Sequence, residues 1–136
     1  MPPSIRFSAA DEAHLQLVPH VSLDLFRRGV ADDDAWATLT TRVNWGTVLA
    51  HRFHGEAVGA METAARALAA IHARRARLGR WGASGPELTA LQVALVMVDE
   101  MQQAHTRREL HDALQVVKKI ERDPARVGEL IEVTEA

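Results

Sequence analysis

The stretch Leu78-Gly79-Arg80-Trp81-Gly82-Ala83-Ser84-Gly85-Pro86-Glu87-Leu88 decides the fold, because it separates two long segments with the apolar spacing of helices. Glycine permits sharp turns and the residue before a proline avoids the helical region, so the chain is predicted to reverse here. Ser84 followed three residues later by Glu87, with Pro86 between them, is the pattern of a capped helix start. We therefore predict a glycine-rich hinge between two helices.

Apolar residues recur at helical spacing on both sides of this hinge and along most of the chain. No segment shows the alternation of a β-strand that we would assign as one. The predicted fold is all-α, a single-domain bundle of four to five helices with short loops over residues 9–123. Residues 1–8 are expected to form a flexible N-terminal arm and residues 124–136 a C-terminal tail. The predicted helices cover residues 9–28, 35–53, 56–78, 86–104 and 107–122.

Two of the predicted helices contain residues that interrupt regular helices. Pro19 lies inside the first, so we expect this segment to divide into two pieces, with Gly29 ending the second. Asp32-Asp33-Asp34 supplies a cap for the next helix, which has many β-branched residues and a candidate turn at residues 44–46. One helix with a weak middle is favoured there over two helices joined by a turn. The wide apolar arc of residues 86–104 predicts that this helix is the central one.

Composition limits the possible classes of protein. The chain of 136 residues has a formal net charge of −2, which gives no overall attraction to nucleic acid or anionic lipid. It contains no cysteine, which excludes disulfides and thiolate sites and is consistent with a reducing compartment. The first residues lack the apolar run of a signal peptide, and no window reaches the ~20 apolar residues of a membrane span. We expect a cytoplasmic protein that does not enter a membrane.

Seven histidines raise the question of a metal site. His51 and His54 have a helical spacing suited to one metal ion, yet the chain has neither His-Glu-x-x-His nor the paired Glu-x-x-His of di-iron bundles. We expect no metal site, and the residues to check are His51, His54, His105 and His111. The sequence also has no Ser/His/Asp set at a nucleophile elbow and no phosphate-binding loop. It therefore predicts no cofactor and no enzymatic activity, with a histidine-based metal-dependent hydrolase as an alternative.

Residues 35–54 resemble the second half of a helix-turn-helix, provided that residues 44–46 form its turn. In that alternative the protein is a DNA-binding regulator. The residues that it would offer to DNA are Arg42, Asn44, Thr47, His51 and Arg52. The acidic residues 32–34 oppose this interpretation, because carboxylates repel the phosphate backbone.

Arginine residues gather at the end of the third predicted helix, in a stretch from residue 63 to residue 86 that contains no acidic residue. The candidate protein-binding residues there are Arg74, Arg75, Arg77, Arg80 and Trp81. Two structural interpretations compete, because cations stabilise a helix C-terminus and long arginine stems cover apolar surface. For Trp81, a plug that seals the end of the bundle is favoured over an exposed anchor for a partner.

The motif Gly-Arg-Trp-Gly-x-x-Gly-Pro-x-Leu at residues 79–88 resembles a hinge found in short uncharacterised helical proteins of bacterial plasmids, integrated elements and phages. The resemblance extends over residues 25–120 and implies a helical fold and a mobile-element setting, with no functional residues carried over. We expect a small non-enzymatic binding or regulatory protein that contacts a protein partner and forms a homodimer through excess apolar surface. We expect a protein of this kind to have a docking surface and no catalytic pocket.

Overall fold

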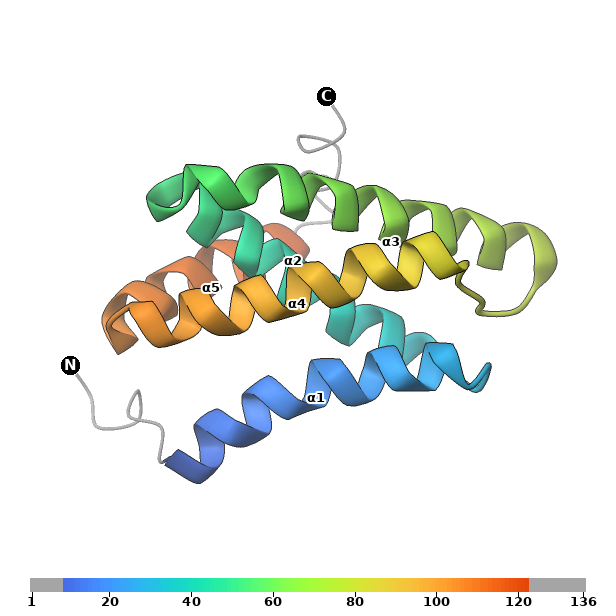
Figure 1. Ribbon diagram of the computed structural model, residues 1–136, viewed down its shortest axis with the longest axis horizontal. Helices are drawn as coiled ribbons and strands as arrows, with labels where there is room; N and C mark the ends of the chain where they lie inside the picture. Colours follow the sequence, from blue (N-terminus) through green and yellow to red (C-terminus); the bar gives the residue numbers. More distant parts are fainter. Residues whose placement is uncertain (1–8, 123–136) are drawn as a thin grey trace.

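The computed structural model describes residues 9–122, with side chains from residue 16 onward, and every regular element within that range is helical. The helices are α1 (Ala9–Arg27), α2 (Asp33–Phe53), the short 3-10 helix η2 (Gly55–Ala57), α3 (Val58–Leu78), α4 (Gly85–Ala104) and α5 (Arg107–Arg122). The predicted all-α bundle with short loops is confirmed (Figure 1). The expected arm at residues 1–8 and tail at residues 124–136 lie outside the described residues.

The central helix of the bundle is α2, which packs against α1, α3, α4 and α5. In Figure 1 it passes behind α4, with α3 above and α1 below. All nine residues from 42 to 50 are buried, as expected for a helix that has neighbours on every side. The prediction that residues 86–104 form the central helix is wrong, because α4 keeps one face open at Val93 and Val96.

The middle of α2 is continuous helix, so no turn is present at residues 44–46. Gly46 lies in this segment, where α3 and α4 come closest to the α2 backbone. A Cβ atom at this position would collide with Val98 Cγ2 and would lie 2.8 Å from the Met61 sulfur. The glycine is therefore a packing residue, and the low helix propensity of this stretch is offset by burial.

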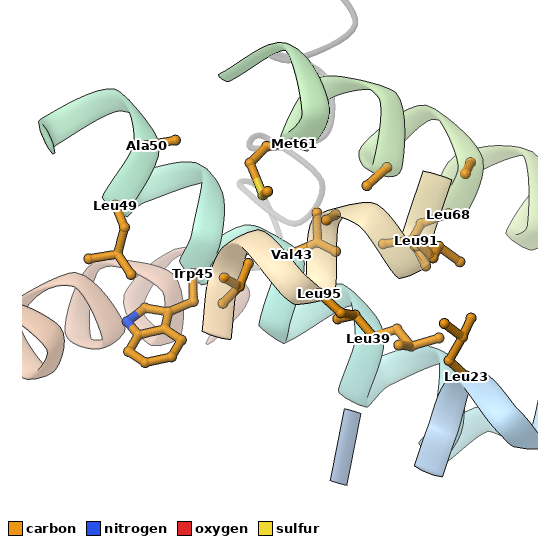
Figure 2. Close-up of a cluster of buried hydrophobic side chains, with 14 of the residues drawn as sticks. Leu23, Leu39, Val43, Trp45, Leu49, Ala50, Met61, Leu68, Leu91 and Leu95 are labelled. Carbon is orange, nitrogen blue, oxygen red and sulfur yellow. The ribbon is translucent and has the colours of Figure 1, made fainter. Parts of the chain in front are cut away.

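Large aliphatic side chains from four helices fill the core around α2. Figure 2 shows Leu39 of α2 close to Leu23 of α1 and Leu95 of α4, with Met61 entering from α3. These four side chains are completely buried. On the α5 side, the buried residues Ala113 and Val117 complete the same cluster. The core is thus one contiguous unit and supports the single-domain assignment for the described residues.

Capping residues set most helix ends where the sequence predicts them. Asp32 caps α2 by accepting a hydrogen bond from the backbone N–H of Ala35 at 2.9 Å. Gly29 and Gly79 have φ values of 73° and 77°, the left-handed conformation that ends α1 and α3. Ser84 begins α4 with the predicted capping box.

The expected division of the first helix at Pro19 is wrong, because α1 runs unbroken from Ala9 to Arg27. A proline inside a helix removes one backbone hydrogen bond and crowds the preceding turn. The side chain of Pro19 is buried, and α1 packs against both α2 and α4. Tertiary packing therefore holds the helix together across the proline.

Substitution of Gly46 by alanine tests the close approach of the three helices. We expect Gly46→Ala to lower the free energy of unfolding by about 1–3 kcal/mol, because the new methyl group overpacks a filled core. The matched control is Gly59→Ala in α3, where a Cβ atom meets nothing within 4 Å. There the better helix propensity should raise stability by up to about 1 kcal/mol. Urea unfolding measures both, and equal effects of the two substitutions would contradict the packing role of Gly46.

Candidate functional site

A cleft of about 890 Å³ opens between α1, α2, α4 and α5. The sequence predicts a docking surface and no catalytic pocket, and it does not predict this concave site. It arises because α1 and α5 both pack on α2 and leave the space between them unfilled. The lining residues are Gln16, Val18, Pro19, Ala37, Thr38, Thr41, Arg42, Trp45, Gln102, Gln103, His105, Thr106, Arg107, Leu110, His111 and Leu114.

The lining of the cleft combines apolar, amide and basic side chains and includes no carboxylate among the described residues. Trp45, Leu110 and Leu114 supply apolar surface from α2 and α5. Arg42 and Arg107 are the arginines of the lining, and the charge of Arg42 is paired with Asp99 of α4. This composition disfavours cationic ligands and suits an acidic group carried on an apolar body.

Arg42 sits at the floor of the cleft with only 7% of its surface exposed. Its Nη2 donates hydrogen bonds to Asp99 Oδ1 at 2.8 Å and to Gln102 Oε1 at 2.7 Å. Its guanidinium also lies over the ring of Trp45, 4.9 Å from the centroid. Burial lowers the pKa of Arg42, while the hydrogen bond and the charge of Asp99 act in the opposite direction. A buried cation needs such partners, and Asp99 also contacts His20 Nε2 at 2.7 Å.

One donor of Arg42 remains without a partner within the described part of the chain, since its buried Nε makes no hydrogen bond. The neighbouring Trp45 is fully engaged, with its Nε1 donating to the carbonyl oxygen of Leu110 at 3.0 Å. Glu121 of α5 accepts a hydrogen bond from Thr41 Oγ1 at 3.1 Å. These contacts fix α5 on α2, so the floor of the cleft is built on rigid elements.

The helix-turn-helix interpretation is wrong in its geometry. It requires a turn at residues 44–46, and those residues lie within the continuous helix α2. Arg42, Asn44 and Thr47, which it offers to DNA, are buried in the bundle. Of the five nominated residues, His51 and Arg52 are exposed, at the end of α2. A helix buried at its middle cannot enter the major groove with that face.

The structure brings together two of the four histidines to check. His54 Nε2 and His105 Nε2 are 2.6 Å apart, and the two rings meet edge to face. His51 is exposed, and His111 lines the cleft. Among residues 16–122, no three histidine or acidic side chains gather as a metal site. The ligand set of a metal-dependent hydrolase is therefore not assembled by these side chains.

The predicted protein-binding arginines divide into structural and exposed residues. Arg74 forms a bidentate pair with Glu87, with both N···O distances 2.9 Å, and also donates to the carbonyl oxygen of Gly82. The guanidinium of Arg75 lies 5.5 Å from the ring centroid of Trp81. Arg77 and Arg80 are exposed. Two members of the predicted site thus stabilise the hinge itself.

Trp81 is a plug at the end of the bundle, as favoured from the sequence. It stacks on Trp36 with ring centroids 5.8 Å apart and meets Phe26 edge to face at 6.3 Å. Its Nε1 donates to Asp33 Oδ1 at 2.7 Å, which ties the hinge to the start of α2. The tryptophan therefore joins α1, α2 and the hinge.

No family model, curated protein or solved structure matches the chain. No described helix has the length and apolar character needed to cross a membrane. We therefore infer function from the chemistry of the residues that form the cleft, the histidine pair and the hinge.

The Arg74–Glu87 pair predicts a pH dependence of stability. The hydrogen bond from Arg74 is the main cause that holds the pKa of Glu87 below its usual value. A lowered carboxyl pKa contributes stability above the unfolded pKa of about 4.3, and this stability is lost as pH falls through the folded pKa. We expect Glu87→Gln to cost about 1 kcal/mol at pH 7 and progressively less below pH ~4.

Unfolding by urea at several pH values measures this difference. The control is Glu100→Gln, which alters an exposed glutamate on the same helix and should cost nothing measurable. A cost for Glu87→Gln that stays constant from pH 7 to pH 3 would contradict the role of the ion pair.

Proposed function

We propose that this protein is a non-enzymatic binding protein that docks an amphipathic, acidic helix of a protein partner in the cleft between α1 and α5. The observation that carries the proposal is the composition of the cleft, which has apolar and basic side chains and no carboxylate among its described lining residues. Helix-in-groove recognition uses an apolar stripe that enters a hydrophobic groove, with charges at the rim that set orientation.

The size and the anchors of the cleft support a protein segment as its occupant. Its volume of about 890 Å³ accommodates several side chains at once. Trp45 and Arg42 lie together at the floor, and tryptophan and arginine are the residues that most often dominate binding energy at interfaces. An acidic side chain of the partner would meet no carboxylate among the described lining residues.

We also propose the biological setting of the protein. The resemblance of the hinge motif supports an accessory or regulatory role in a mobile element, and we propose that the protein acts in the cytoplasm. Neither alternative function gains support from the described side chains, because the DNA-reading face is buried and no third ligand of a hydrolase site joins His54 and His105.

Blocking the cleft with a charge tests the proposal. We expect Ala37→Glu to abolish capture of a partner from an extract of the source cells, because Ala37 is exposed and lines the cleft. The matched control is Ala73→Glu, an identical change at an exposed position of α3 outside the cleft, which should leave capture unchanged. Calorimetry with the purified partner then quantifies the loss, expected to exceed tenfold in Kd. Equal binding by both variants, or no partner captured by the wild type, would contradict the proposal.

A homodimer is the second part of the proposal and rests on a different surface. Leu17 and Val21 of α1 are 58% and 49% exposed, and Val93 and Val96 of the adjacent α4 are 49% and 41% exposed. Apolar side chains gathered on neighbouring helices are typical of an interface between subunits. We expect light scattering after size-exclusion chromatography to give twice the 15.0 kDa chain mass, and Val93→Glu to give the monomer mass. A monomeric wild type at high micromolar concentration would remove the dimer.

A further inference from the structure

We propose that His54 and His105 form a binding site for a divalent transition-metal ion of the zinc class. The two residues are 51 positions apart in the sequence, and each occupies the C-terminal cap position of its helix, α2 or α4. The fold brings their Nε2 atoms to 2.6 Å from each other. This site is independent of the partner proposed above, although His105 also lines the cleft.

Each imidazole has a carboxylate next to its Nδ1 atom, on the side of the ring away from the other histidine. Glu56 Oε1 lies 3.3 Å from His54 Nδ1, and Glu109 Oε1 lies 3.3 Å from His105 Nδ1. Metal-binding histidines commonly donate their second ring N–H to a carboxylate, which fixes the tautomer and strengthens the ligand. Here the same arrangement occurs twice, so both rings are oriented as ligands by residues of their own turns.

The tautomers of the two rings decide what lies between them. A carboxylate at Nδ1 favours a proton on that nitrogen, and a ring in this tautomer presents the lone pair of Nε2 to the other ring. Two lone pairs that face each other at 2.6 Å repel. The contact therefore holds either the proton of one ring in its Nε2–H tautomer, donated to the other ring, or a metal ion shared by both rings.

The geometry suits a metal ion after a small movement. Zinc binds histidine nitrogen at about 2.0–2.1 Å, so two tetrahedral ligands place their nitrogens about 3.3 Å apart, and the rings must separate by about 0.7 Å. The His54 and His105 side chains are 24% and 11% exposed, so the pair is accessible to solvent from one side. Phe53 packs against His105 with centroids 4.4 Å apart and limits its movement.

The chemistry of the pair defines the class of ion. Imidazole nitrogen suits zinc, copper and nickel, whereas magnesium and calcium require oxygen ligands. Because no third histidine or acidic ligand converges among the side chains of residues 16–122, water would fill the remaining positions. The site is thus an open, exchangeable one and differs from the closed four-ligand sites that stabilise small folds.

Titration of the untagged, EDTA-treated full chain with zinc chloride in a calorimeter tests this inference. We expect one zinc ion per chain, with His54→Ala and His105→Ala each weakening binding at least tenfold. Glu56→Gln should weaken it about tenfold, because this exposed glutamate orients His54 without a role in the core. His51→Ala is the matched control in the last turn of α2 and should bind as the wild type does. Magnesium chloride should give no binding.

The outcomes of the titration distinguish a metal site from a proton shared by the two rings. No zinc binding by the wild type, or binding unchanged in the His54→Ala and His105→Ala variants, would overturn the metal site and leave a proton between the rings. Far-UV circular dichroism checks that each variant keeps its fold. If His105→Ala unfolds, His105→Gln replaces it, since glutamine keeps a polar side chain and removes the imidazole. A loss of zinc binding in His51→Ala equal to that in His54→Ala would also contradict the assignment.

Discussion

The burial of the middle of α2 is the constraint on which the rest of the structure depends. A helix surrounded on all sides must have small residues where its neighbours come closest, and partners for most of the polar groups that it buries. Gly46 meets the first requirement, since it lies against Val98 of α4 and Met61 of α3. The second requirement determines where α4 and α5 lie.

The polar residues of α2 recruit specific partners from the C-terminal half of the chain. Arg42 is paired with Asp99 and Gln102 of α4, and Asn44 Nδ2 donates to Glu121 of α5 at 3.3 Å. Such bonds are stronger in a buried site than at the surface, and they specify one arrangement of the helices. The cleft is a consequence, because α1 and α5 are each fixed to α2 and have few contacts with each other. The packing of the fold thereby creates the candidate binding site.

The sequence alone predicts the features that local chemistry controls. The capping box at Ser84, the glycine stop at position 79 and the acidic cap at Asp32 depend on neighbours within a few residues, and all are confirmed. The central position of α2, the cleft and the pairing of His54 with His105 depend on contacts between different helices, which span 51 positions for the two histidines and which periodicity does not encode. Polar residues in an apolar stretch, such as Arg42 and Asn44, were the available signal. They indicate buried partners as readily as a surface for DNA.

Native-state hydrogen exchange of the backbone amides tests the central role of α2 most directly. Amides in the interior of a central helix exchange only when the whole protein unfolds, whereas peripheral helices open locally. We expect the amides of residues 43–50 to be the slowest in the chain, with a free energy of opening equal to that of global unfolding. Rapid exchange at residues 44–46, or slower exchange in α1 or α5 than in α2, would contradict it.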